Sequence, residues 1–235
     1  MIKYNLNLKK NLEEAEAEEL ITYNNPQHVN FFQDTQTVKR IKLLLDEYIE
    51  DAKYYRHWIH AVESLNEGDM VYISVNSYGG NLDGAIAIIN AMKSTLADVH
   101  VCIDGSAASA ASLIALTAPS VSVSPYASMM IHSATFGAFG KQSNVISHAS
   151  FIDKQVKSLM QDIYKDFLTE SEFQEVIVGR EIWLDSAEII ARLNRRAVIQ
   201  QERLDAEADK EEKALELIEL EELAEKPKPR SRSKK

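Results

Sequence analysis

The hydrophobic pattern between residues 70 and 132 predicts strands that alternate with helices. The run MVYISVN (70–76) is rich in β-branched and aromatic residues and lies between polar turn segments, so it predicts a buried strand. Residues 83–94 carry apolar side chains at helical spacing, and the small-residue run 105–116 predicts a turn that enters a helix. Three more short apolar runs predict strands: 98–104, 121–124 and 128–132.

The C-terminal half of the chain is mostly helical in pattern. Residues 143–168 predict one long helix, and residues 171–178 predict a shorter one. Residues 183–193 predict another helix, with Asp185 or Ser186 as its N-cap.

Residues 39–65 leave two alternatives open: one long helix, or a strand at 40–45 followed by a turn and a helix. The alternation of strands and helices predicts an α/β fold with parallel strands. Composition divides the chain into a polar, acidic N-terminal extension (1–38), this α/β domain (39–196) and a Glu-, Leu- and Ala-rich segment with a basic tail (197–235).

The charge and composition exclude several classes of function. The net charge of −10 argues against a nucleic-acid binder, and the basic tail KPKPRSRSKK is typical of a solvated, disordered segment. No apolar stretch approaches the roughly 20 residues of a membrane span, and no signal peptide precedes the acidic N-terminus. The single cysteine, Cys102, excludes an internal disulfide, so we expect a cytoplasmic protein.

No cofactor motif stands out either. The sequence has no Cys/His cluster with metal-ligand spacing and no Gly-rich phosphate loop, so we expect no metal and no cofactor. Any ATP-driven step would then depend on a partner protein.

Three short motifs carry the candidate chemistry. A serine hydroxyl becomes a nucleophile only when a base removes its proton and N–H groups stabilise the resulting oxyanion. Ser109 lies in Gly-Ser-Ala-Ala-Ser-Ala (105–110), whose small side chains allow a sharp turn before a helix N-terminus. Asn-Ser-Tyr-Gly-Gly (76–80) and His132 each follow another predicted strand, at the sheet edge where α/β sites assemble. Each motif alone is typical of ordinary packing, whereas the ordered set indicates a serine–histidine site.

This ordered set resembles the ClpP proteolytic-subunit family of serine peptidases, and the resemblance covers residues 40–193. It implies Ser109 as the nucleophile, His132 as the general base, and the N–H groups of Gly80 and Ala110 as the oxyanion hole. It also implies a ClpP/crotonase-like α/β fold of repeated β-β-α units, with residues 39–65 as strand, turn and helix. Residues 141–168 would form the strand and long helix of a protruding "handle".

The resemblance leaves the third member of the catalytic triad open. It puts Ile177 where the family has an aspartate, and four acids lie nearby: Glu172, Glu175, Glu181 and Asp185. We expect Glu181 first, with Glu175 as an alternative, because a small loop shift would bring it into place. A Ser–His dyad and a triad completed on assembly are the other possibilities.

The resemblance further implies polypeptide substrates, a homo-oligomer of heptameric rings and an ATP-dependent unfoldase as a partner. The apolar stripe on residues 143–168, which includes Val156 and Met160, predicts burial against another subunit, with packing inside its own chain as the alternative. The bacterial housekeeping subunit of the family lacks the acidic C-terminal segment. In this feature the chain looks more like the ClpP-like peptidases encoded by bacteriophages, some of which act in head maturation. Two other classes stay open: a catalytically silent ring subunit, and a crotonase-type enzyme that polarises a thioester.

Overall fold

The structure is a computed structural model, and it describes residues 37–135, 137 and 139–225. The chain divides into two units, Met1–Thr37 and Val38–Lys235, and the described residues belong almost wholly to the second. The predictions for the N-terminal extension and for the basic tail therefore lie outside the described residues.

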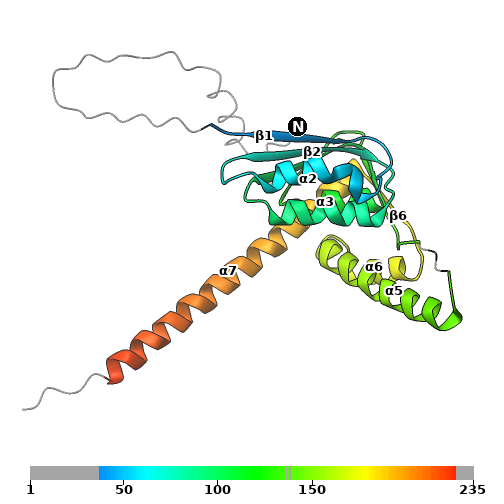
Figure 1. The fold of residues 1–235 in the computed structure, drawn as a ribbon. Helices are drawn as coiled ribbons and strands as arrows, with labels where there is room; N and C mark the ends of the chain where they lie inside the picture. Colours follow the sequence, from blue (N-terminus) through cyan, green and yellow to red (C-terminus); the bar gives the residue numbers. More distant parts are fainter. Residues whose placement is uncertain (1–36, 136, 138, 226–235) are drawn as a thin grey trace, which may run out of the picture. The chain divides into compact units, whose positions relative to one another are not determined.

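Six strands of the described residues form one mixed sheet in the order β1-β2-β3-β5-β6, with β4 beside β3. Figure 1 shows the first two strands, β1 and β2, side by side. The strands are β1 Arg40–Leu45, β2 Met70–Ser77, β3 Asp98–Ala108, β4 Ser120–Val123, β5 Ser128–Ile131 and β6 Ile182–Asp185. The first half of β3 pairs with β4 and its second half pairs with β5, all in parallel. Only the pairing of β5 with β6 is antiparallel among the described strands.

The helices cover one face of this sheet. A 3-10 turn, η2 (Ala52–Tyr55), leads into α2 (Arg56–Glu63), which packs beside α3 (Leu82–Ser94) along the first strands (Figure 1). The strand residues facing these helices are buried aliphatics, whereas their alternating neighbours are polar and half-buried, as the two-residue period of a strand requires. The short helix α4 (Ala110–Thr117) is buried along almost its whole length.

Most of the predicted elements are confirmed within one to four residues, and the α/β fold is confirmed with them. For residues 39–65 the second alternative holds, since a strand, a turn and a helix follow one another there.

Two of the elements expected in the C-terminal half are wrong. Helix α5 (Gln142–Tyr164) begins directly after Lys141, so residues 141–168 contain no handle strand. Residues 182–185 form strand β6 rather than the start of a helix. In this strand Leu184 is 4% exposed and Trp183 is 57% exposed, as expected for alternating side chains. The strand is too short for this alternation to be detected next to the helical pattern that follows.

The last helix, α7 (Ser186–Glu225), is continuous and joins two segments that the sequence analysis treated separately. It begins at the predicted cap, because Asp185 Oδ1 accepts from Glu188 N–H at 2.9 Å and Glu188 Oε2 accepts from Asp185 N–H at 3.0 Å.

The apolar stripe of α5 packs mainly inside its own chain. Val156 and Met160 are 8% and 2% exposed and belong to the hydrophobic core of this chain, where α5 contacts α4. Their expected burial against another subunit is therefore wrong. The apolar residues of α5 that stay exposed are Ile146 (61%) and Phe151 (64%).

Helix α6 (Glu170–Ile177) is tied to α7 by one carboxylate. Glu172 closes a capping box with Thr169 and accepts two hydrogen bonds from Arg192, at 2.9 and 2.6 Å. The guanidinium of Arg192 is the main reason that the pKa of Glu172 falls from its ordinary value of 4.5 to about 2. The ionised form of Glu172 therefore stabilises the folded chain.

This ion pair predicts a pH-dependent stability. A carboxyl group whose pKa is lowered by folding stabilises the folded chain at pH values above its pKa in the unfolded chain. This contribution is lost as the pH falls from about 4.5 towards 2. We expect Glu172→Gln to lower the free energy of unfolding by about 1–2 kcal/mol at pH 7. In urea unfolding, the difference from the wild type should shrink as the pH approaches 2.

The matched control is Glu175→Gln, since Glu175 pairs with the more exposed Arg180 and should change the unfolding free energy by less than about 0.5 kcal/mol. Equal stability losses for the two variants at pH 7 would contradict this account.

Candidate active site

Ser109 lies at the junction of β3 and α4 in a backbone conformation that few residues adopt. Its φ is 55° and its ψ is −125°, and the backbone of any residue other than glycine is strained in this conformation. The Ser109 N–H donates to the carbonyl of Met130 in β5 at 2.8 Å. This turn projects the serine side chain out of the sheet edge, as a nucleophile requires.

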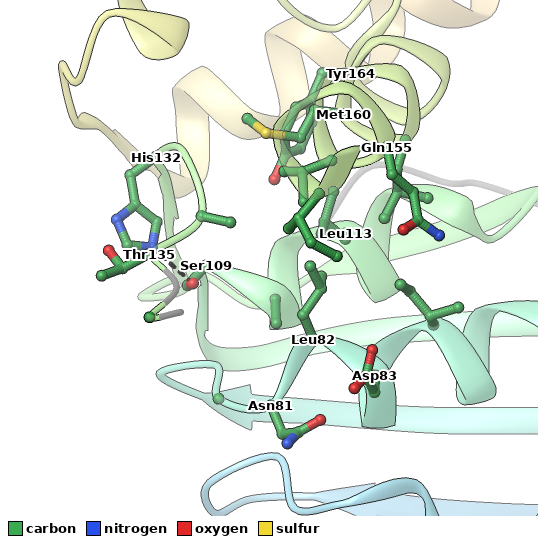
Figure 2. Close-up of a pocket in the computed structure, with 18 of the residues that line it drawn as sticks. Asn81, Leu82, Asp83, Ser109, Leu113, His132, Thr135, Gln155, Met160 and Tyr164 are labelled. Atoms are coloured by element: carbon green, nitrogen blue, oxygen red, sulfur yellow. Dashed lines mark hydrogen bonds between the residues drawn. The ribbon is translucent and has the colours of Figure 1, made fainter. Parts of the chain in front are cut away.

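His132 faces this serine. It follows β5, which pairs in parallel with the end of β3, and its Nε2 lies 2.7 Å from Ser109 Oγ (Figure 2). Both side chains are only partly buried, so a substrate can reach them. The geometry allows the imidazole to take the hydroxyl proton directly.

The glycine pair after β2 packs against the serine turn. Gly79 has φ 95°, and a Cβ built on it would lie 2.6 Å from the Ala108 carbonyl oxygen and 2.7 Å from Ser109 Cβ. Only glycine allows this approach without displacing the backbone. The loop and the serine turn are therefore held in direct contact.

This contact brings the two expected oxyanion donors to the same place. Ala110 is the first residue of α4, where the N–H has no partner within the helix. Gly80 lies between two anchored amides, because Gly79 N–H bonds Ser77 Oγ and Asn81 N–H bonds the Ile49 carbonyl. Gly80 and Ala110 both line the cavity that contains Ser109 and His132.

Asn76, the last residue but one of β2, supports the serine turn through its side chain. Its Oδ1 accepts from Ser106 N–H at 3.0 Å. A Cβ on Gly105 would lie 2.1 Å from that oxygen, so the small residue before the turn is required for this contact.

A cavity of about 500 Å³ opens beside Ser109. Its walls are apolar side chains of α3, α4 and α5, and the polar side chains of Asp83 and Gln155 also line it (Figure 2). His148 is a further polar residue of the lining. The apolar residues are Leu82, Ile86, Leu113, Ile152, Val156, Leu159 and Met160. The sequence analysis missed this cavity, because it assigned the stripe of α5 to a subunit contact.

Four of the five residues considered for the third triad position have other roles. Ile177 packs against the core, and Glu172 is paired with Arg192. Glu175 pairs with Arg180, and Asp185 caps α7. Among the described residues, no acid forms an ion pair with His132.

Glu181 remains, and it directly precedes the strand that pairs with β5. In the antiparallel pairing of β5 with β6, Met130 is opposite Trp183 and Ile131 is opposite Ile182. Continuing the register by one residue places Glu181 opposite His132, and directly opposed residues share one face of the sheet. The Glu181 carboxylate accepts from Trp183 Nε1 at 3.2 Å, so a side-chain rotation would be needed for it to reach the imidazole.

The described residues contain no group of three or more His, Cys, Asp and Glu side chains placed to hold a metal ion. No helix within the described part of the chain is both long and apolar enough to cross a membrane.

Comparisons with known proteins show which family this chain resembles. Residues 28–192 match the family model described as Clp protease. The chain is 28% identical over 132 residues to the ATP-dependent Clp protease proteolytic subunit 1 of Chlamydia abortus, which covers 54% of this chain and 68% of that protein. It is 26% identical over 138 residues to the proteolytic subunit 2 of Borreliella burgdorferi, covering 58% of this chain and 70% of that protein.

Proposed function

This chain belongs to the Clp protease family, and we propose that it is a serine endopeptidase that uses Ser109 and His132. The observation that carries the proposal is the 2.7 Å approach of His132 Nε2 to Ser109 Oγ on a strained turn. A serine and a histidine that only filled space would not need this geometry.

The reaction follows from the positions of these groups. Ser109 Oγ attacks the carbonyl carbon of the scissile peptide bond, while His132 Nε2 takes the hydroxyl proton. The N–H groups of Gly80 and Ala110 stabilise the oxyanion of the tetrahedral intermediate. His132 then gives its proton to the leaving amine, and a water molecule deacylates Ser109 by the same steps in reverse.

The cavity beside Ser109 supports a polypeptide substrate with a large apolar residue on the acyl side of the scissile bond. That residue carries the attacked carbonyl, so its side chain must lie next to Ser109. The apolar walls from α3, α4 and α5 favour an aliphatic or aromatic group there.

The names of the relatives support an assembled, ATP-dependent system. The proteins of Chlamydia abortus and Borreliella burgdorferi are described as proteolytic subunits of an ATP-dependent protease. Since this sequence carries no Gly-rich phosphate loop, a separate unfoldase would supply the ATP-driven step. The proposed assembly is a homo-oligomeric ring of seven subunits that encloses the serine sites. A role in phage head maturation stays a prediction.

A catalytically silent ring subunit is the second candidate. It is favoured by the absence of an acid bonded to His132 among the described residues. A thioester-polarising enzyme of the crotonase type is less favoured, because it has no use for the Ser109–His132 pair.

The first prediction here concerns the nucleophile. Ser109→Ala should lower peptide cleavage at least about 10³-fold and abolish covalent labelling by a fluorophosphonate probe. Folding should be unchanged, because Ser109 is partly exposed and its hydroxyl bonds only to His132 among the described residues. The control is Ser106→Ala, three residues earlier, which should label and cleave like the wild type. Labelling that persists in Ser109→Ala would show that another residue is the nucleophile.

The second prediction concerns Glu181 as the residue that orients His132. Glu181→Gln should lower kcat about 10²-fold with little change in KM, because the carboxylate supports the imidazolium that forms during the reaction. Glu175→Gln is the control and should keep full activity, since Glu175 pairs with Arg180 instead. A fully active Glu181→Gln variant would favour a Ser–His dyad.

The third prediction concerns assembly. Ile146 and Phe151 are large apolar residues that α5 leaves exposed, and we expect another subunit to cover them. The double variant Ile146→Asp, Phe151→Asp should give smaller species than the wild type in light scattering after a sizing column. Lys154→Asp is the control, because it changes the charge of the same helix at an exposed polar position. A monomeric wild type that cleaves peptides would contradict the ring.

A further inference from the structure

The hydroxyl of Ser112 is unusual in α4, where the neighbouring buried residues are aliphatic. Ser112 is 0% exposed, and among the described residues the other buried polar ones are Asp69 and Ser77, at 5% and 1%. Its Oγ lies 2.7 Å from the carbonyl oxygen of Ser109 and 2.8 Å from the hydroxyl of Tyr164. Tyr164 ends α5, is 2% exposed and also lines the cavity beside Ser109.

The direction of these hydrogen bonds follows from counting protons. A carbonyl oxygen can only accept, so Ser112 uses its single hydroxyl proton for Ser109. The Ser112 oxygen must then accept, and Tyr164 donates to it. Burial raises the pKa of the Tyr164 phenol, so the phenol keeps the proton that it donates. The chain of hydrogen bonds therefore runs in one direction, from Tyr164 through Ser112 to Ser109.

The end of this chain is the peptide bond between Ser109 and Ala110. No peptide bond of the described residues is cis, and in a planar trans peptide the C=O and the N–H point in opposite directions. A hydrogen bond that fixes the Ser109 carbonyl therefore also fixes the direction of the Ala110 N–H. It also polarises the peptide, because successive hydrogen bonds strengthen one another.

We propose that Tyr164 and Ser112 are positioning residues that orient and polarise the Ser109–Ala110 peptide, and through it the oxyanion donor Ala110 N–H. The inference rests on the proposed function, because it assigns these residues a role in stabilising the oxyanion of that reaction. It also links α5, whose residues form the wall of the substrate cavity, to the nucleophile turn.

A purely structural role predicts a different outcome. If the two hydroxyls only satisfied one another in the core, their loss would lower stability without changing the rate at each folded site. If they polarise the oxyanion donor, their loss lowers kcat and leaves KM nearly unchanged, since the oxyanion forms only during the reaction. The backbone N–H of Ser112 also bonds the Ser109 carbonyl, at 3.0 Å, so part of the geometry survives in either variant.

The test compares Ser112→Ala, Tyr164→Phe and the double variant in the full-length, assembled protein. Active sites are titrated with a fluorophosphonate, so that kcat refers to folded sites only. We expect kcat to fall about 5- to 20-fold in Ser112→Ala and about 3- to 10-fold in Tyr164→Phe, with KM within about twofold. The double variant should match Ser112→Ala, because one break already interrupts the chain. A peptide aldehyde, whose hemiacetal places an oxyanion in the same site, should lose affinity by the same factors.

The matched control is Thr117→Val, which removes another hydroxyl of α4 that bonds a helix carbonyl, that of Leu113 at 2.9 Å. It should leave kcat unchanged. The inference would be overturned if kcat were unchanged in Tyr164→Phe and Ser112→Ala. It would also be overturned if the decrease in kcat of the double variant equalled the product of the two single decreases. In both cases the proposed function would stand. A wild type that neither cleaves peptides nor labels at Ser109 would overturn both.

Discussion

The backbone of Ser109 is the constraint on which the rest of the site depends. A residue other than glycine at φ 55° and ψ −125° costs about 1–3 kcal/mol, so the surrounding structure must hold it there. Its N–H is bonded to Met130, its carbonyl is bonded to Ser112, and Gly79 packs against its Cβ. The strained turn aims the hydroxyl at His132 and leaves the first N–H of α4 without a helical partner.

Strand β3 supplies the scaffold for this constraint. It is eleven residues long and pairs with β2, β4 and β5, so the three motifs of the site meet at its C-terminal end. The glycine loop follows β2, the serine follows β3 and the histidine follows β5. A shift of one residue in any of these pairings would turn the alternating side chains to the other face and separate the groups. The correct register of these strands is therefore needed to bring the residues of the proposed catalytic site together.

The sequence alone could predict which short motifs lie together at the sheet edge, because this depends on local patterns. The serine turn, the glycine pair and His132 each follow a recognisable strand, and parallel strands bring such ends together. The position of Glu181 relative to His132 could not be predicted in this way, because it depends on the antiparallel register of β5 with β6. About fifty residues of chain separate these two strands. The strand at 182–185 is itself too short for its period to be separated from the helix that follows.

Helix α5 shows a different limit of sequence patterns. Its apolar spacing indicated a buried stripe, but periodicity does not reveal what covers a stripe. In the fold, Val156 and Met160 line the cavity beside Ser109, whereas Ile146 and Phe151 are exposed. The buried pair of Tyr164 and Ser112 was likewise invisible, since the two residues are 52 positions apart.

The most direct measurement of the central claim uses a peptide chloromethyl ketone with a large apolar residue next to the reactive ketone. A serine at attacking distance adds to the ketone, and a histidine beside it is alkylated by the chloromethyl carbon, so one molecule reports both groups together. Mass spectrometry of the digested adduct should find the inhibitor on His132 in the wild type, with the alkylation greatly slowed in Ser109→Ala. Modification of a different histidine, or equal alkylation of His132 with and without the serine, would contradict the account of a Ser109–His132 catalytic pair.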